Sequence, residues 1–440
     1  MGRLAVEGRR AATAVVAVVL VLAPRATHAI PVFARVYDKP CSACHTVYPQ
    51  LNPEGERFRD RGLHGFTPAI APIRVAPGLD VPGTLPLALS ASVGDEIGKT
   101  DVPGRDDETR EQINTFLGLL AGGELGPHLA FLVDYALLYT DGRTGKTEAG
   151  TRPGMAMVQA HAALGSWLTN LRAGAFELPL GASPRVHRLF ARGYSIYGTS
   201  AFSLLGVRPP VDGRRKDTLS LASTQIGGEL SALDDSTGAT AALGVVAGSN
   251  NRKDNNSSKD VYLRLGRRFG FHNAGFFAYY SPDILGHGAH DGAARFGPDL
   301  TLYTRRFRLV AQALAGHDAS PTAHGEPLWH WGGFLEGNLR LTPALIALLR
   351  VDHVGTPTFD DRAAGGTTRV RRRIWEVTGG AQYLLAENLK VVVEASYGNN
   401  YEAVARSTVE SWSVTVRLAT AFWPLTPPDL LPWLERWRGE

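Results

Sequence analysis

The residues with the best-defined chemistry lie in a short motif near the N-terminus. Cys41 and Cys44 are separated by two residues, His45 follows directly, and no other cysteine occurs in the 440 residues. This C-x-x-C-H spacing is typical of c-type haem attachment, in which each thiol adds to a vinyl group and the imidazole ligates the iron. A zinc site would need further ligands nearby, and a redox dithiol would not need the histidine. The motif therefore predicts one covalent haem c, with His45 as the proximal axial ligand.

A short helix is predicted directly after the motif. Asn52 is a favourable N-cap, Pro53 suits the first helical position, and Gly62 is a favourable terminator. Phe58 would lie on the inner face of this helix, against the haem. Residues 30–81 form a segment of only about fifty residues, which rarely builds a stable core without a staple. We therefore expect a small α-helical cytochrome segment, attached to a larger unit that covers one face of the haem.

The N-terminus predicts export from the cytoplasm. Three arginines within the first ten residues precede an apolar run over residues 11–23, and small residues lead to Ala29. This order is typical of a secretory signal peptide over residues 1–29, cleaved after Ala29. The apolar run is too short for a membrane-spanning helix, which needs about 20 apolar residues. An exported chain with this motif fits a bacterial envelope.

From residue 84 onward the hydrophobic pattern has a period of two, which is typical of half-buried strands. In residues 129–140 the apolar face consists of Leu129, Phe131, Val133, Tyr135, Leu137 and Tyr139. Residues 389–397 and 412–418 alternate in the same way, with Lys390, Glu394 and Ser396 on the polar face of the first. We count about sixteen such segments, beginning near residues 84, 110, 128, 154, 170, 222, 238, 258, 272, 296, 306, 328, 343, 372, 388 and 410.

The connections between these segments alternate between short and long. Short ones include residues 233–238 and 386–388, and long ones include residues 181–221 and 355–371. An even number of antiparallel strands with short turns on one side predicts an all-β outer-membrane barrel over residues 82–423. Residues 424–440 would be a periplasmic tail. The aromatics expected at the two lipid interfaces are Trp167, Tyr139, Trp412, Phe422 and Trp423.

An even strand count puts both chain termini on the periplasmic side, with the short turns. The haem segment is therefore expected at the periplasmic end of the barrel or inside its lumen. For the distal haem ligand the first candidate is His64, the only later histidine in the cytochrome segment. The strand register points His128 and His161 inward as alternatives, with Met155 and Met157 behind them.

The segment around the motif resembles the fused monohaem cytochrome–porins of the bacterial outer membrane, a family that includes outer-membrane iron oxidases. The shared residues cover some thirty positions: Ile30, Pro31, Phe33, Ala34, Arg35, Cys41, Cys44, His45, Pro49, Leu51, Asn52, Gly55, Phe58 and Gly62. The family also has a barrel of similar size. Its iron oxidases tend to have arginine, glutamine, threonine and glycine ahead of the first cysteine. This chain has Arg35, Val36, Tyr37 and Asp38 there, so the donor does not follow from the resemblance.

Together these features predict electron transfer across the outer membrane, from an extracellular donor such as Fe(II) to a periplasmic carrier of the cytochrome c type. Activity as an iron(II)-oxidising, cytochrome c reducing oxidoreductase follows if iron is the donor. Two alternatives stay open: electron export to an extracellular acceptor, and a diffusion porin whose haem segment is a plug. The partners are then outer-membrane lipid and the two redox partners. The net charge of +4 with scattered arginines argues against a nucleic-acid surface.

Carboxylates and histidines also gather in the predicted long loops. Such side chains are ligands for ferrous and other divalent ions, so these loops are candidates for metal capture at the outer surface. The residues concerned are Asp283, His287, His290, Asp291, His317, Asp318, His324, Glu326, Asp352, His353, Asp360 and Asp361.

Overall fold

The computed structural model describes most of the chain after the predicted signal peptide. The described residues are 32–101, 103, 108–140, 147–150, 153–184, 189–190, 192–205, 211–212, 215–216, 219–250, 254, 257–282, 290–321, 327–361, 368–402 and 407–422. The predicted signal peptide, Ile30, Pro31, Trp423 and the predicted tail lie outside them.

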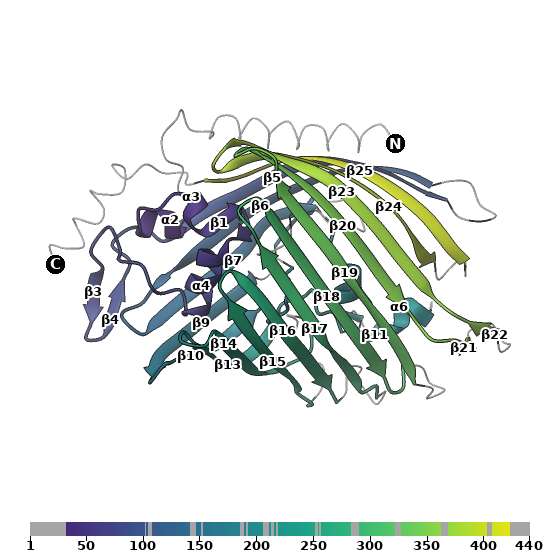
Figure 1. Cartoon of the computed structure of the whole chain (residues 1–440), viewed down its shortest axis with the longest axis horizontal. Coiled ribbons are helices and arrows are strands. Elements are labelled where there is room, and N and C mark those ends of the chain that lie inside the picture. Colours follow the sequence, from purple (N-terminus) through teal and green to yellow (C-terminus); the bar gives the residue numbers. More distant parts are fainter. Residues whose placement is uncertain are drawn as a thin grey trace.

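Sixteen antiparallel strands close into a barrel (Figure 1). In chain order they are β5 (Leu87–Asp101), β6 (Glu108–Glu124), β7 (Leu129–Thr140), β9 (Pro153–Leu164), β10 (Trp167–Phe176), β13 (Gln225–Asp234), β14 (Ala239–Val246), β15 (Asp260–Phe269), β16 (His272–Ser281), β17 (Ala293–Tyr303), β18 (Phe307–Asp318), β19 (Leu328–Arg340), β20 (Leu345–Gly355), β23 (Arg373–Ala386), β24 (Leu389–Glu402) and β25 (Ser407–Phe422). The short β8 (Thr147–Ala149) and β9 both pair with β7, so they occupy one strand position in the barrel. Pairing of β25 with β5 closes the barrel. The predicted fold class is confirmed, and each strand begins within three residues of its predicted start.

The side chains alternate between a lipid-facing exterior and a polar interior. On β25, Trp412, Val414 and Val416 are 40–49% exposed. Ser413 and Thr415, between them, are buried inside the barrel. An apolar outer surface on a closed barrel suits a bilayer, because every backbone polar group is paired within the sheet.

The predicted alternation of outward and inward side chains is wrong in the C-terminal part of β7. The pairing of β6 with β7 shifts between Leu117 and Gly118, which leaves Leu137 without an opposite residue. This β-bulge moves the alternation by one residue, so Leu138 rather than Tyr139 is exposed beyond it. A bulge cannot be read from a two-residue period.

The N-terminal segment forms short elements rather than a separate domain. They are α2 (Val32–Val36), α3 (Cys41–Cys44), β1 (His45–Val47), β2 (Gln50–Leu51) and α4 (Pro53–Asp60), followed by the hairpin β3 (Ile73–Ala76) and β4 (Leu79–Val81). The predicted helix is confirmed as α4: the Asn52 side chain accepts from the N–H groups of Glu54 and Gly55, and Gly62 has a φ of +74°. Within the described residues, no helix has the length and apolar character to cross a membrane.

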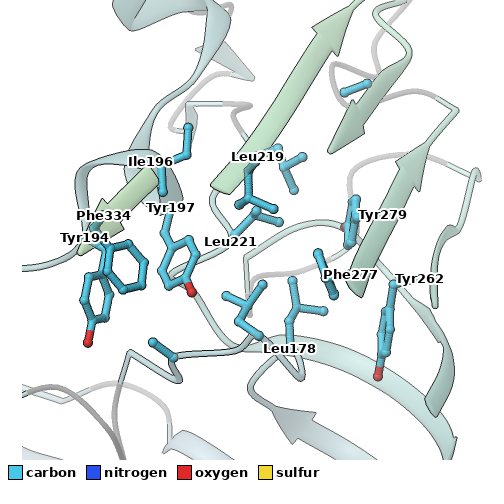
Figure 2. Packing of buried hydrophobic residues seen from close by; sticks show 14 of the residues in the cluster. Leu178, Tyr194, Ile196, Tyr197, Leu219, Leu221, Tyr262, Phe277, Tyr279 and Phe334 are labelled. Carbon is cyan, nitrogen blue, oxygen red and sulfur yellow. The ribbon is translucent and has the colours of Figure 1, made fainter. Parts of the chain in front are cut away.

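The connection from β10 to β13, residues 177–224, turns into the barrel. We call it the inner loop; its described elements are α5 (Ser195–Gly198), α6 (Ala201–Leu205), β11 (Val211–Asp212) and β12 (Arg215–Lys216). Figure 2 shows Tyr194, Ile196 and Tyr197 of the loop in one apolar cluster with side chains of the barrel wall. Tyr194 stacks on Phe334 of β19 with ring centroids 4.1 Å apart. In the long connection between β20 and β23, β21 (Phe359–Asp361) pairs with β22 (Thr368–Val370).

Candidate functional site

The motif lies in a segment seated in the mouth of the barrel that carries the short turns. We call residues 32–66 the plug segment. Its Glu56 is buried and accepts hydrogen bonds from Tyr303 Oη at 2.6 Å and from Asn273 Nδ2 at 2.9 Å. Arg308 lies 3.9 Å from the same carboxylate. These three partners come from β16, β17 and β18, next to short turns.

Other parts of the wall hold the plug segment from different directions. Tyr37 donates to Glu124 of β6 at 2.7 Å. Asn170 of β10 donates to the Asp60 carbonyl at 2.8 Å, and Arg340 of β19 donates to the Thr46 carbonyl at 3.1 Å. The plug segment is therefore surrounded by strands, in agreement with the predicted location at the periplasmic end of the barrel or in its lumen.

Glu56→Ala is expected to release the plug segment from the wall. The substitution removes two hydrogen bonds to a buried carboxylate, together with one of the carboxylates near the buried Arg308 guanidinium, a loss of about 3 kcal/mol or more. Limited proteolysis of the folded protein in detergent should then cleave residues 32–66 faster than in the wild type. Glu54→Ala is the matched control, because Glu54 is half exposed on the same helix. Equal protection of the two variants would contradict the assignment of Glu56 as an anchor.

The motif itself has a fixed backbone. Cys41 and Cys44 begin and end the single turn of α3, and both thiols are free. The Asn52 side chain donates to the carbonyls of Ser42 at 3.0 Å and Ala43 at 3.1 Å, while its oxygen caps α4. One asparagine thus ties the motif to the helix that follows it.

The imidazole of His45 is held by its own turn. Nδ1 lies 3.1 Å from the carbonyl oxygen of Pro49, the contact that metal-ligating histidines commonly make through the nitrogen that does not bind metal. Burial lowers the pKa of His45 to about 4, against the opposing effect of the Pro49 and Gln50 backbone. The ring is therefore neutral at neutral pH, as a ligand must be.

The two thiols are protonated at neutral pH. Burial raises the pKa of Cys41 to about 11, with a further contribution from Glu387, and burial also raises the pKa of Cys44. Two free thiols on one helical turn beside a neutral, backbone-held imidazole form a donor set that fits a c-type haem. Haem attachment itself stays a prediction.

Gly55→Ala is expected to displace the motif. A Cβ at Gly55 would overlap the carbonyl oxygen of Cys44 and lie 2.9 Å from Leu51 Cδ2, so α3 and α4 must separate. We expect the covalent haem content per barrel, measured by absorbance, to fall severalfold. Gly198→Ala is the control, because nothing lies within 4 Å of its Cβ position. The same haem content in both variants would show that the close approach is not needed.

Phe58 lies on the buried face of α4, as predicted. Its ring centroid is 5.3 Å from that of Phe33, 5.5 Å from that of Tyr37 and 5.2 Å from that of Phe66. These four rings form a small core between the plug segment and Ala130 of β7. The contact of Phe58 with haem stays a prediction.

The candidate distal ligands are gathered in one place. The His64 ring lies 3.9 Å from that of His161 and His128 lies 5.7 Å from His161, measured between ring centroids. His161 belongs to β9, whereas the His45 turn contacts Lys390 of β24. Around the barrel, β24 and β9 are separated by β25, β5, β6 and β7. The structure thus brings the three histidines together next to β9, whereas His45 lies next to β24. Met155 and Met157 are buried near the other end of β9 from His161.

The inner loop meets the plug segment inside the barrel. Leu189 and Phe190 of the loop pack in one cluster with Val47, two residues after His45, and with Ile346 and Leu348 of β20. A cavity of about 200 Å³ lies between the loop, α4 and the wall. Its lining includes Arg59, Arg172 and Glu177, together with both methionines of β9.

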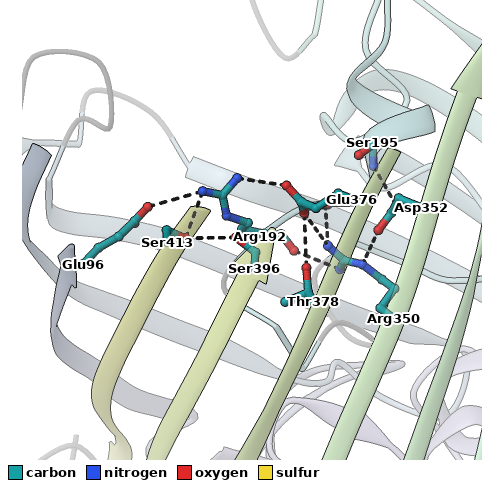
Figure 3. A network of polar contacts seen from close by, with 10 residues as sticks. Glu96, Arg192, Ser195, Arg350, Asp352, Glu376, Thr378, Ser396 and Ser413 are labelled. Atoms are coloured by element: carbon teal, nitrogen blue, oxygen red, sulfur yellow. Dashed lines mark hydrogen bonds and ion pairs between the residues drawn. The ribbon is translucent and has the colours of Figure 1, made fainter. Parts of the chain in front are cut away.

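A polar network fastens the inner loop to the wall (Figure 3). Arg350 of β20 is fully buried, bonds Asp352 at 2.6 Å, and donates to the carbonyls of Arg192 and Gly193. Arg192 in turn reaches Glu376 of β23 at 3.0 Å. Charged pairs thereby hold the loop to the part of the wall formed by β20 and β23.

The loop residues proposed for metal capture are only partly at an outer surface. Asp318 and Asp352 are fully buried inside the barrel and pair with Arg295 and Arg350, respectively. Among the residues that the structure describes, no three His, Cys, Asp or Glu side chains are grouped as metal ligands. Asp283, His287, His324 and Glu326 lie outside the described residues.

Two residues that join the plug segment to the wall carry little or no sequence signal. Glu56 has the pattern of a solvent-facing helical carboxylate, and only the barrel wall makes it a buried anchor. Lys390 falls on the polar face of its strand, so its inward direction follows from the alternation. Its partner in the plug segment, the Tyr48 carbonyl, does not.

No protein-family model matches the chain, and no curated protein sequence matches it. Solved structures do share the fold. An anion-selective porin from Comamonas acidovorans aligns with a TM-score of 0.51 and 12% identity, covering 76% of this chain and 99% of that porin. OmpF of Salmonella typhi in complex with daunomycin aligns with a TM-score of 0.50 and 11% identity, covering 78% and 98%. OprB of Pseudomonas putida aligns with a TM-score of 0.50 and 10% identity, covering 76% of this chain and 94% of OprB.

At this identity the likeness concerns the fold, which agrees with the predicted location in a bacterial outer membrane. The chain therefore has the sixteen-stranded barrel fold of outer-membrane porins, with its N-terminal segment seated inside the barrel.

Proposed function

We propose that this protein is an outer-membrane c-type cytochrome–porin that transfers electrons between an extracellular donor and a periplasmic carrier. The observation that carries this proposal is the position of the Cys41, Cys44 and His45 donor set, on a plug segment held inside a porin-like barrel. When bound, the haem would supply a one-electron Fe(III)/Fe(II) couple. Cys41 and Cys44 would hold it covalently, and His45, oriented by the Pro49 carbonyl, would ligate its iron.

The segments that lie within the barrel favour a redox conduit over an open pore. The plug segment occupies the short-turn mouth, and the inner loop reaches it at Val47 from the other side. A diffusion porin needs a water-filled channel that stays open to solutes. Electron transfer needs only protein packed around the redox group. The lipid layer is about 30 Å thick, so a single haem inside the lumen shortens the distance to either side.

The exposed residues before the motif offer a contact for a periplasmic carrier. Asp38, Lys39, Pro40 and Ser42 are all exposed, while Cys41 and Cys44 are half-buried beneath them. A soluble cytochrome c could approach the thiol side of the motif there without entering the barrel. Fe(II) is the donor class we propose for the opposite side, which makes the protein an iron(II)-oxidising, cytochrome c reducing oxidoreductase.

Proteoliposomes test the proposal. The protein is reconstituted with a soluble cytochrome c sealed inside, and ferrous iron is offered outside to vesicles that carry the barrel. We expect the internal cytochrome to be reduced by the wild type and not by the haem-free Cys41→Ala/Cys44→Ala variant. A haem-loaded protein that gives no internal reduction would overturn the conduit. Entry of small sugars at porin-like rates would support a diffusion porin instead.

Direction is tested with the same vesicles. Exchanging the compartments, with reduced cytochrome c inside and a ferric acceptor outside, measures electron export. Faster export than import would reassign the external partner as an acceptor.

A further inference from the structure

A lysine of the barrel wall makes direct contact with the turn that holds His45. Lys390 of β24 is buried, and its Nζ donates to the carbonyl oxygen of Tyr48. The same Nζ donates to Gln382 Oε1 of β23 at 2.9 Å. A buried ammonium loses much of its hydration free energy, and apolar substitutes are cheaper for stability alone. Its presence at this position therefore suggests a role beyond barrel stability.

Tyr48 is in the turn that also orients the imidazole. This turn joins β1, which begins with His45, to β2, and its next residue, Pro49, provides the carbonyl 3.1 Å from His45 Nδ1. Arg340 of β19 holds Thr46 of the same hairpin through its carbonyl. Two basic side chains of the wall thus hold the backbone carbonyls of Thr46 and Tyr48, which follow His45 in the hairpin.

The other end of this contact reaches the inner loop. Gln382 Nε2 donates to the carbonyl of Leu189 at 2.6 Å, and Leu189 packs with Val47 in the hairpin. The Lys390–Gln382 pair therefore bridges the inner loop and the β1–β2 hairpin through the barrel wall. Movement of either segment away from the wall would break the bridge.

We propose that Lys390 is a positioning residue for the proximal haem ligand: it fixes the β1–β2 hairpin that orients His45. This inference rests on the proposed haem function. Hydrogen bonding in the shell around an axial ligand is one of the features that set the potential of a haem. The lowering effect of Lys390 on the pKa of His45 is consistent with the proximity of these two residues.

Lys390→Met removes both hydrogen bonds at nearly constant side-chain length. In a redox titration followed by the haem spectrum, we expect the Fe(II):Fe(III) ratio at a fixed potential to change about tenfold, which is 59 mV for one electron. Lys390→Arg should recover most of the difference. Lys99→Met is the matched control, because Lys99 of β5 pairs with Asp101 and lies on another strand. A potential unchanged by Lys390→Met would overturn the inference.

A second measurement does not depend on haem. Hydrogen exchange of residues 45–51 is compared in the haem-free Cys41→Ala/Cys44→Ala barrel with and without Lys390→Met, after heat-modified gel migration has shown both to be folded. Faster exchange of these residues supports the positioning role, and unchanged exchange overturns it. Gln382→Leu, which keeps Lys390, should also accelerate exchange if the bridge is continuous. A wild type without covalent haem would overturn the proposed function, and the exchange result would still decide the role of Lys390 in the hairpin.

Discussion

Replacing Cys41 and Cys44 together by alanine is expected to abolish covalent haem while the barrel still assembles. The two thiols are the only cysteines in the chain, so no other residue can form the thioethers. Neither thiol takes part in the sheet, whose strands pair from β5 round to β25 without the plug segment. Haem staining after denaturing electrophoresis should be lost completely, and the heat-dependent gel shift of a folded barrel should remain.

Ser42→Ala is the matched control for this variant. Ser42 lies between the two cysteines, its side chain is exposed, and the contact it makes with Asn52 uses its backbone carbonyl. Its haem content should equal that of the wild type. His45→Ala should keep the covalent bonds but change the absorption spectrum, because the proximal ligand is gone. Full haem staining of the double alanine variant would show that the motif is not the attachment site.

Arg350→Met is expected to detach the inner loop and open the lumen to solutes. Arg350 is fully buried, pairs with Asp352, and donates to the carbonyls of Arg192 and Gly193 in the loop. Removing it leaves the buried carboxylate of Asp352 without its cation, a loss of about 3–5 kcal/mol. Sugar-driven swelling of proteoliposomes should rise severalfold, and the denaturant midpoint should fall.

Arg369→Met provides the comparison for that result. Arg369 of β22 pairs with Asp360 of β21 at 3.8 Å, but its side chain is 79% exposed. Exposed pairs of this kind contribute little, so neither swelling nor the midpoint should change appreciably. If Arg350→Met behaves like Arg369→Met, the inner loop is held by its apolar cluster and not by the charged network.

The agreement between prediction and structure is closest where the physical cause is local. The cap of α4 depends on Asn52, Pro53 and Gly62, all adjacent in the chain. The strands depend on residues two apart, which is why their starts agree within three residues. The bulge at Leu137 was not predicted because it depends on how β6 and β7 pair. The pairing of two strands does not change the hydrophobic period within either strand.

In the candidate site, too, the local features were predicted and the long-range contacts were not. The order of Cys41, Cys44 and His45 predicts haem attachment by itself, because two thioethers and one imidazole ligand to the same haem require that spacing. The gathering of His64 with His161 and His128, away from the β24 side that holds His45, could not be read from the sequence. Those neighbours are set by where the plug segment docks, and docking depends on many contacts that each look ordinary in sequence.

The amino-acid sequence alone thus determined the motif, the helix after it, the number of strands and, outside the β-bulge on β7, the side of the sheet that the strand residues face. All of these follow from spacings of a few residues and from the free energy of burying apolar side chains. Tertiary structure decided that Glu56 meets Tyr303 and Arg308, that Leu189 reaches Val47, and that Lys390 holds Tyr48. These contacts join residues more than a hundred positions apart, and they form only when the closed barrel confines the plug segment and the inner loop in one lumen.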